Sequence, residues 1–350
     1  MIDLAARHAR VAAAVEARVV EVLRSGRYIG GPVVAQAEQA AAGLLGRRHG
    51  VGVGSGTDAL TLALKALGVG PGDEVIVPAV SFFATVESVL HTGATPVFVD
   101  VLPDRPLLDP RAAAAAVGAR TRAIVPVHLF GDTAPAPEVG VPIVDDCAQS
   151  IGCTPPPLRG VLAAVSFYPT KVLGAAGDGG LVATDDPDLA ATVRRLGSHG
   201  MSAPNVHHLV RGHVGGNSRL DAVQAAVLLG HMDSLAQRVA RRRELAGRLD
   251  QELAPLPIPR DPGSPVSVYV IRHPQRDRLQ AALQAQGIHT AVYYPMALTA
   301  QEVVGGDAAR ARALTPHAAA FCAEALALPC HEDLDDADVM RLIQAVKALR

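Results

Sequence analysis

The segment SFYPTKVLGAAGDGG, residues 166–180, places one lysine between the end of a strand-like run and four glycines. Glycine lets the backbone turn tightly and approach a ligand closely, so this segment has the composition of a binding loop. A lysine in such a loop can bind a phosphate, form a structural ion pair or act as an amine nucleophile. Lys171 alone does not separate these alternatives, so the rest of the chain has to decide among them.

Short apolar runs, mostly β-branched, alternate with alanine-rich segments of helical periodicity along the first half of the chain. Runs that are apolar almost throughout are typical of strands buried on both faces. The segments 57–68, 82–93 and 109–119 have helical periodicity, and the last opens with Asp-Pro in cap and first-turn positions. The pattern predicts an α/β fold, a mostly parallel sheet with helices on both faces. The predicted strands are 51–54, 74–78, 95–100, 122–127, 142–146, 163–167 and 180–184.

A long helical pattern rich in Ala, Leu and Arg runs from about 219 to 253 and is interrupted only by two glycines. The proline-rich segment at 255–265 then separates it from a shorter segment of αβ pattern. Clusters of proline and glycine between periodic segments mark connections and domain boundaries. We therefore predict a large domain at 1–240 and a small C-terminal αβ domain at 241–350, with the N-terminal helix free to pack on the small domain.

Composition and charge exclude several classes of protein. The 350 residues are 49% apolar with a net charge of −2 and no long run of one sign, so the chain is neither disordered nor suited to nucleic acid. Its longest apolar stretches are too short or too interrupted to cross a bilayer, and the N-terminal segment lacks a signal-peptide pattern. We expect a cytoplasmic protein with no membrane contact. The four cysteines have no CxxC spacing, which argues against zinc and favours core thiols.

Polar residues at the carboxyl ends of strands are the most informative, because ligands of open α/β sheets bind there. The first strand is followed by GSGTDAL, in which Gly54 and Gly56 allow close approach while Ser55 and Thr57 supply hydroxyls. The N-terminus of a helix favours an anion such as phosphate, although Ser-Gly-Thr is also an ordinary N-cap. The segment fits neither a GxxxxGK[ST] phosphate loop nor a GxSxG nucleophile motif.

Two adjacent acids, Asp145 and Asp146, end the apolar run in PIVDDCAQS. Left unpaired in the interior they would be costly, so we expect a positive partner; a capping aspartate or structural ion pair is the alternative. Ser166 and Lys171 follow the next strand. A phosphate cradle, an acid with no obvious partner and a lysine in a glycine-rich turn together predict a pyridoxal phosphate site.

Each residue type matches one requirement of that cofactor. A lysine holds the aldehyde as a Schiff base, a carboxylate keeps the pyridine nitrogen protonated, and hydroxyls with a helix N-terminus bind the phosphate. A flat side chain over the ring is also usual, and Phe82, after the strand at 74–78, is placed to provide it.

The motifs and their order resemble the DegT/DnrJ/EryC1/StrS family of sugar aminotransferases, which have the fold-type I aminotransferase architecture. The resemblance extends over nearly the whole chain, through SGTDALTLAL, GPGDEVIVPAVSFFAT, GATPVFVDV, VHLFGD, DDCAQS, SFYPTKVLGAAGDGG, GGNSRLDAVQAAVL, YVIRHPQRDRL and ALALPCHEDL. So many motifs in one order are far more specific than any one of them. The resemblance implies a pyridoxal phosphate-dependent enzyme that moves an amino group, with L-glutamate as the expected donor, to a nucleotide-linked keto-sugar.

The resemblance also implies roles for individual residues. Lys171 would form the Schiff base and move the proton between the two imine forms, Asp146 would pair with the pyridine nitrogen, and Gln149 would bond the ring hydroxyl. Asn217 would reach the phosphate of the neighbouring subunit's cofactor, which makes a homodimer the smallest active unit. The implied cofactor-binding residues are Gly56, Thr57, Phe82, Asp146, Gln149, Ser166, Lys171 and Asn217, and the implied substrate-binding residues are His199, Tyr293 and Tyr294.

Other features bear on the substrate. NSRLD at 217–221 resembles the branch of the family that aminates carbon 3, although Ser218 fits an ordinary helix cap equally well. The segments 133–141 and 153–163 are shorter than usual in the family, which predicts a trimmed flank of the large domain. Thr299 stands where many members have a histidine, a difference that concerns the sugar pocket.

Two other functions are considered. The first is a sugar dehydratase of the same family, but those members carry a histidine at the Schiff-base position, so Lys171 disfavours it. The second is a catalytically silent regulatory or binding homologue, for which the shortened segments would be the reason.

Four histidines, His199, His207, His208 and His213, cluster around a glycine-rich segment and raise the question of a metal. Their spacing lacks the HExxH pattern that places two ligands on one helix face. We therefore expect loop histidines that face solvent or substrate, and no metal site.

Overall fold

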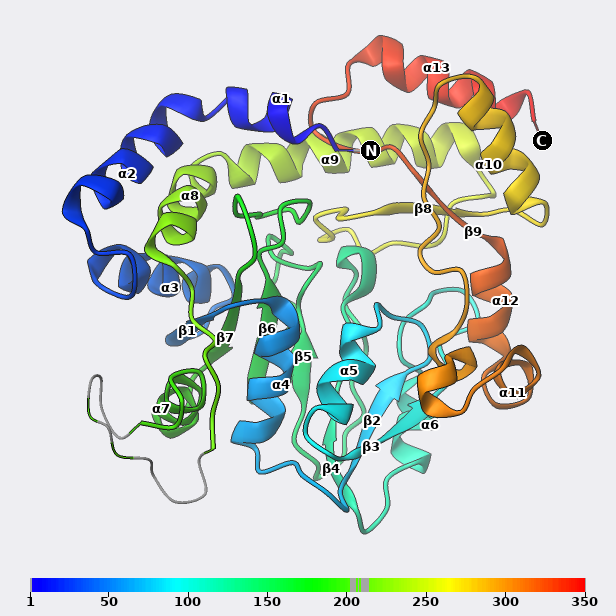
Figure 1. Ribbon diagram of the computed structural model, residues 1–350. Helices are drawn as coiled ribbons and strands as arrows, with labels where there is room; N and C mark the ends of the chain where they lie inside the picture. Colours follow the sequence, from blue (N-terminus) through cyan, green and yellow to red (C-terminus); the bar gives the residue numbers. More distant parts are fainter. Residues whose placement is uncertain (1, 202–205, 207, 209–213, 350) are drawn as a thin grey trace.

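A central β-sheet organises the chain in the computed structural model, which describes residues 2–201, 206, 208 and 214–349 (Figure 1). Four strands pair in the order β1-β7-β6-β5 and three in the order β3-β2-β4, and parallel bridges from Ile124 to Ile143 and from Val127 to Asp146 join the two groups. The predicted strands are all present. Their bounds are β1 His49–Val53, β2 Glu74–Pro78, β3 Thr95–Val99, β4 Thr121–Ile124, β5 Val144–Asp146, β6 Leu162–Ser166 and β7 Gly180–Thr184.

The sheet is mostly parallel, as predicted, with β7 as the exception. β7 runs antiparallel to both of its neighbours, β1 and β6. Antiparallel neighbours can be joined by a loop, whereas parallel ones need a crossover. The chain therefore turns back from β6 to β7 through residues 167–179, and this return loop carries Lys171. Its base is closed by the Phe167 N–H, which donates to the Gly179 carbonyl over 2.8 Å.

Both faces of the sheet are covered by helices, which explains why the strands are apolar throughout. In β6, Ala163 and Val165 point into one core, while Leu162 and Ala164 point into the other. The first core is shared with helices α2 (Ala12–Ser25), α3 (Pro32–Leu44) and α8 (Ala222–Met232). The second is shared with α4 (Gly56–Ala66), α5 (Ala84–Leu90) and α7 (Pro187–Leu196), while α6 (Pro110–Ala115) packs on β2, β3 and β4.

A second, smaller sheet pairs two antiparallel strands, β8 and β9, in the C-terminal part of the chain. The long helix α9 joins the two parts, because Leu235 and Val239 pack in the core of α2 and α8 while Leu245 and Leu249 pack against the small sheet. The division at residue 240 stays a prediction. The remaining elements are α1 Leu4–Ala9, η1 Leu129–Gly131, β8 Tyr269–Arg272, α9 Leu235–Leu253, α10 Arg276–Ala285, η2 Leu298–Ala300, η3 Glu302–Val304, α11 Ala308–Leu314, α12 Pro316–Glu324, β9 Ala325–Leu328 and α13 Asp336–Lys347.

The prediction of one helix over 219–253 is wrong in two respects. The helical structure begins only at Ala222, and it is broken between Met232 and Leu235 into α8 and α9. Two side chains cap the C-terminal end of α8. The His231 carbonyl accepts a hydrogen bond from the Arg238 guanidinium at 3.1 Å and one from the Ser234 hydroxyl at 3.3 Å. These partners satisfy an exposed end carbonyl without further helical turns.

The shortened segments carry no helix. Residues 132–143, all of them described, run from η1 to β5 in extended and irregular conformations, and residues 152–161 run to β6 in the same way. The flank of the sheet beside β5 is therefore covered by loops, as the sequence predicted.

Gly230 lies where α8 crosses α2, and it provides a first prediction. A Cβ at this position would stand 2.6 Å from Val15 Cγ2 and 3.1 Å from Val15 Cα, closer than van der Waals contact allows. We expect Gly230→Ala to force the two helices apart and to lower the free energy of unfolding by about 1–3 kcal/mol.

Gly247→Ala in α9 is the matched control, because nothing lies within 4 Å of its Cβ position. It should raise the free energy of unfolding by about 0.5–1 kcal/mol by removing the flexibility of a helical glycine. Urea unfolding compares the two; stabilisation by both would contradict the close crossing.

Candidate active site

A cavity of about 740 Å³ lies at the carboxyl ends of β5 and β6, where polar residues from many elements meet. Most of the predicted site residues line it. Those that do are Gly56, Thr57, Phe82, Asp146, Gln149, Ser166, Lys171, Tyr293 and Tyr294, and they are joined by Ser55, Ser81, Asp178 and others. The fold thus collects side chains from opposite ends of the sequence into one chamber.

The N-terminus of α4 forms one end of this cavity. Ser55 is its N-cap, since the Ser55 hydroxyl accepts the Asp58 N–H at 3.1 Å. Gly56 and Thr57 stand in the first turn, where N–H groups have no acceptor within the helix and the helix dipole favours negative charge. A Cβ on Gly56 would lie 2.6 Å from Ser166 Cβ, so glycine is what allows α4 to start directly against the end of β6. The cap in Ser-Gly-Thr is confirmed for Ser55, and the anion site on the residues after it stays a prediction.

Asp146 is a buried carboxylate at the end of β5. Its Oδ1 accepts the Ala148 N–H at 3.1 Å, and its Oδ2 accepts the Thr85 hydroxyl at 3.2 Å. Burial raises the pKa of Asp146, and the opposing effects come from the Ala148 N–H, the nearby charge of Lys171, the Thr85 hydroxyl and His128. The Asp146 carboxylate has two fixed donors and also lines the cavity, so it can accept one more hydrogen bond from a ligand.

Lys171 faces Asp146 from the return loop between β6 and β7. Burial lowers the pKa of its amine, because the ammonium form loses hydration, and the Asp146 carboxylate only partly offsets this. The Lys171 N–H donates to the Tyr168 carbonyl over 2.8 Å, which forms the turn that presents the side chain. A lowered pKa increases the fraction of neutral amine, the form that attacks carbonyl carbon.

The two adjacent acids have separate surroundings. Asp145 Oδ2 accepts the backbone N–H groups of Arg159 at 2.9 Å and Gly160 at 2.7 Å, and Oδ1 lies 3.3 Å from His128 Nε2. His128 Nδ1 accepts a backbone N–H, so Nε2 carries the proton and donates it to Asp145. The expected positive partner is therefore Lys171 for Asp146, whereas Asp145 is stabilised by N–H donors instead of a lysine or arginine.

Aromatic and amide side chains also line the cavity. Gln149 Oε1 accepts the Phe130 N–H at 2.7 Å, and its Nε2 lies 3.5 Å from the Tyr294 hydroxyl. The Phe82 ring is 6.3 Å from that of Tyr294 and is 45% exposed, so its face is open to a flat ligand. Burial also raises the pKa of Tyr294 and keeps its hydroxyl neutral.

Other predicted residues lie elsewhere. Asn217 and His199 are exposed and do not line the cavity, although Ser198 and Asn217 pair in one antiparallel bridge. Ser218 is not the cap of α8, whose N-cap is Asp221. Its hydroxyl donates to Asp58 at 2.8 Å and accepts the Gly54 N–H at 2.9 Å, which fixes this segment beside the start of α4.

Thr299, which departs from the family pattern, is buried and its hydroxyl forms a hydrogen bond with that of Thr315 at 2.8 Å, so it does not line the cavity either.

His207 and His213 lie outside the described residues. Within the described part of the chain, no group of three or more potential ligands could hold a metal ion.

Sequence reasoning missed three polar residues around Asp146. Thr85 and Ser81 form a hydrogen-bonded pair of hydroxyls over 2.8 Å, and His128 lies behind Asp145. The only available signal was position, because SFFAT and VHLFGD follow predicted strands and so come to the same edge of the sheet. Nothing in those motifs indicated which hydroxyl would reach the carboxylate.

Comparison with known proteins places this site in a family. The DegT/DnrJ/EryC1/StrS aminotransferase family matches residues 10–347. The chain belongs to this family.

Individual members with substrates in their names are also similar. UDP-2-acetamido-2-deoxy-3-oxo-D-glucuronate aminotransferase of Pseudomonas aeruginosa is 37% identical, with 99% of this chain and 98% of that protein covered. dTDP-3-amino-3,4,6-trideoxy-alpha-D-glucose transaminase of Streptomyces venezuelae is 40% identical, with 99% and 94% covered. The crystal structure of S. venezuelae DesV in complex with a ketimine intermediate has a TM-score of 0.92 and 38% identity, with 99% and 97% covered.

Pyridoxal phosphate is the cofactor of this enzyme. Solved structures of similar chains carry it or its pyridoxamine form. The cavity fits the group on its own evidence: it combines a buried amine of lowered pKa, a buried carboxylate, a helix N-terminus and an open aromatic face. The protein is therefore a pyridoxal phosphate-dependent sugar aminotransferase of α/β fold.

The separate roles of the adjacent acids provide a second prediction. Asp145→Asn would place an amide NH₂ group against at least one of the two backbone N–H donors or His128, so we expect the free energy of unfolding to fall by about 2–4 kcal/mol. Asp146→Asn should cost less stability but should sharply lower activity, because the amide no longer stabilises a protonated nitrogen. Chemical unfolding and steady-state kinetics on both variants measure this; a catalytic defect in Asp145→Asn at full stability would reverse the assignment.

Proposed function

We propose that the enzyme transfers an amino group from L-glutamate to carbon 3 of a nucleotide-linked keto-sugar. Both named relatives carry the nitrogen or the oxo group at carbon 3, one on a UDP-linked and the other on a dTDP-linked sugar. The NSRLD segment, which resembles the carbon-3 branch, supports the same position. Because the two relatives differ in nucleotide and in sugar, the proposal specifies the carbon and leaves the nucleotide open.

One observation carries the mechanism: a buried amine and a buried carboxylate face one cavity, each lowering the cost of the other's charge. When bound, the cofactor supplies an electron sink for the charge that develops as the amino acid loses its Cα proton. Lys171 would hold the cofactor aldehyde and, once released, would take the Cα proton and return it to the carbon on the other side of the amino nitrogen. Both half-reactions use this one amine in a ping-pong scheme.

The remaining residues would hold the cofactor in place. Asp146 would keep the ring nitrogen protonated, since its two fixed donors leave an acceptor lobe toward the cavity. The first-turn N–H groups of Gly56 and Thr57, with the Ser166 hydroxyl, would bind the phosphate. Phe82 would stack on the ring, and Gln149 would bond its hydroxyl.

Tyr293 and Tyr294 would contact the sugar, because both line the cavity. His199 is proposed to approach the sugar from outside the cavity of its own chain, on the ground of family resemblance. Lys171 disfavours the dehydratase alternative, and the complete set of catalytic groups disfavours a silent homologue.

We propose further that the active sites are shared in a homodimer. Asn217 is exposed, outside its own cavity, yet Ser218 holds the same segment against Gly54 and Asp58 at the start of α4. An exposed amide so placed is suited to donate to the phosphate of a cofactor in a second chain. His199 lies on the adjacent turn, where its N–H donates to the Gly216 carbonyl over 2.8 Å.

We place the protein in the cytoplasm, where nucleotide-linked sugars and L-glutamate are available. No helix in the described residues has the length and apolar character needed to cross a membrane. All four cysteines are free thiols buried in the protein, which suits a reducing compartment.

Loss of the lysine amine is the direct test. We expect Lys171→Ala to lower amino transfer from L-glutamate to a nucleotide-linked 3-keto-sugar by on the order of 10³-fold or more while the fold survives. The wild-type protein loaded with pyridoxal phosphate should absorb in the visible and lose that band on borohydride treatment, and the variant should lack the response. Lys65→Ala, at an exposed position on α4, is the matched control. Wild-type turnover by Lys171→Ala would disprove the role of this lysine.

The shared site can be tested by mixing two inactive proteins, Lys171→Ala and Asn217→Asp. In a mixed dimer, sharing puts both lesions into one site and leaves the other site intact, so activity should rise toward half that of a wild-type dimer. If each chain built its own site, every site would contain one lesion and activity would stay at the level of the parents. Mass spectrometry confirms subunit exchange, which makes an inactive mixture decisive against sharing.

A further inference from the structure

Three buried arginines surround one buried glutamate between α1, α9 and the segment that follows β9. Arg7 Nε lies 3.1 Å from Glu332 Oε1, Arg242 Nε lies 2.6 Å from Glu332 Oε2, and Arg238 Nη1 lies 3.5 Å from Glu332 Oε1. All four side chains are less than a tenth exposed. The mechanism described above uses none of these groups.

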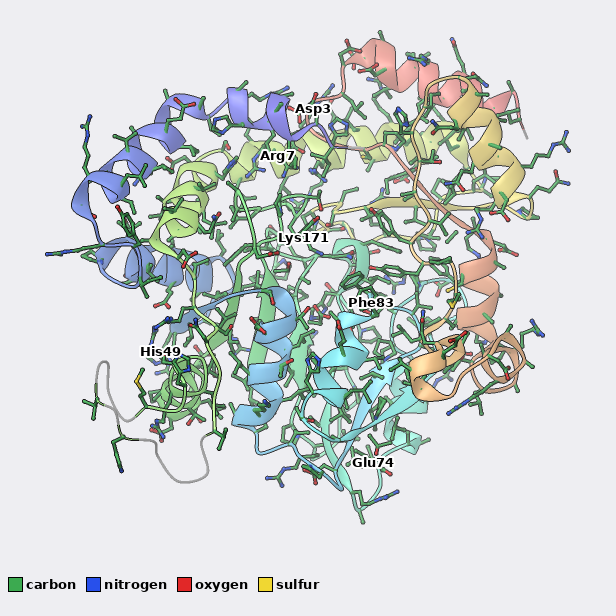
Figure 2. All side chains as sticks on the ribbon, in the orientation of Figure 1. Asp3, Arg7, His49, Glu74, Phe83 and Lys171 are labelled. Atoms are coloured by element: carbon green, nitrogen blue, oxygen red, sulfur yellow. The ribbon has the colours of Figure 1, made fainter. Side chains whose placement is uncertain are left out.

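The same arginines hold the backbone of the lysine loop. Arg7 Nη1 donates to the Pro169 carbonyl at 3.2 Å and to the Lys171 carbonyl at 3.0 Å. Arg238 Nη1 donates to the Val172 carbonyl at 2.8 Å. Arg7 belongs to α1, and Figure 2 shows it on the side of this helix that faces Lys171 and the sheet.

These contacts supply what the loop lacks. Three glycines follow Lys171 before β7 and add no side-chain contacts, so the loop is anchored through its side chains mainly by Val172 and Leu173, which pack in the core. Carbonyls in a strand or helix are fixed by a ladder of N–H donors, but those of Pro169, Lys171 and Val172 take their donors from guanidinium groups. A guanidinium presents several N–H groups in a rigid fork, so one arginine can fix two carbonyls and a carboxylate together.

The charges of the cluster keep it together. Burial alone would disfavour the Glu332 carboxylate, yet Arg242, Arg7 and Arg238 hold the pKa of Glu332 at about 2. Burial in turn lowers the pKa of Arg7, which makes this cation dependent on its anionic partner. Breaking one member of such a buried network is costly, because it leaves the others without a counter-charge.

We propose that Arg7 is a positioning residue for the catalytic lysine, joining the N-terminal helix and Glu332 to the main chain on both sides of Lys171. This inference rests on the proposed function in one respect, the catalytic role of Lys171. The amine sits at the end of a flexible four-carbon stem, so its reach is set by where the backbone lies. Misplacement of a catalytic group by about 1 Å can cost on the order of a hundredfold in rate.

The chain offers a matched control in Arg10. Its Nε lies 2.9 Å from Asp333 Oδ1, so it joins the same helix to the same segment after β9, one residue further along. The Arg10 side chain is more than half exposed, and no described contact links it to the lysine loop. Arg10→Met therefore loosens the attachment of α1 without removing the donors to Pro169 and Lys171.

The experiment compares Arg7→Met with Arg10→Met in the full-length protein loaded with pyridoxal phosphate. We expect Arg7→Met to lower kcat by about tenfold to a hundredfold while KM for the nucleotide-sugar changes by less than about twofold. Deuterium uptake of peptide amides in 166–176 should rise in Arg7→Met and stay at the wild-type level in Arg10→Met. This second readout needs no sugar substrate, so a wrong substrate assignment would leave it intact.

Conservative replacement separates positioning from folding. Arg7→Lys keeps a cation beside Glu332 but replaces the rigid fork of the guanidinium with donors on a single nitrogen, so its kcat and its deuterium uptake should lie between wild type and Arg7→Met. If Arg7→Met does not fold, the same two measurements on Arg7→Lys decide. Wild-type kcat and uptake in either Arg7 variant, or equal losses in Arg7→Met and Arg10→Met, would overturn the proposal.

Discussion

The cost of burying charge governs the arrangement of this protein around its cavity. An amine and a carboxylate are both kept from water at the end of the sheet, and each is disfavoured there unless fixed donors or an opposite charge replace the lost hydration. Asp146 gains two hydrogen bonds and the charge of Lys171, while Lys171 gains only Asp146. The return loop between β6 and β7 brings Lys171 into the same cavity as Asp146, at the end of β5.

Two successive residues of one strand, β5, place one acid in a structural setting and the other at the cavity. In β5, Asp145 and Asp146 point to opposite faces, as successive residues of a strand must. Asp145 is enclosed by His128 and two backbone donors and holds the shortened segment before β6 in place. Asp146 faces the cavity. The replacement of a helix by loops on this flank is thus compatible with an intact site, since the buried histidine and aspartate tie those loops to the sheet.

The sequence predicted those elements whose structure is decided by residues close together in the chain. The apolar runs predicted every strand of the large sheet, and the Asp-Pro pair at 109–110 predicted the start of α6. The lysine, the carboxylate and the start of α4 could be predicted to share one cavity, because each lies at or just after the end of a strand. The break between α8 and α9 could not be predicted, because it depends on Arg238 capping a carbonyl across a turn. The cluster of Arg7 and Glu332 lay beyond any spacing rule, since its members come from the two ends of the chain.

That separation in sequence gives the active site an order of assembly. Arg7, in α1, precedes the lysine loop in the chain, and Glu332, after β9, lies far beyond it. The loop with Lys171 is made between them, when its donor from the N-terminal helix exists but the glutamate that compensates this donor does not. The complete cluster can thus hold the lysine loop only after Glu332 has been synthesised, so the last residues to complete the support of the reactive amine come from the segment after β9 and not from the loop's own neighbours in sequence.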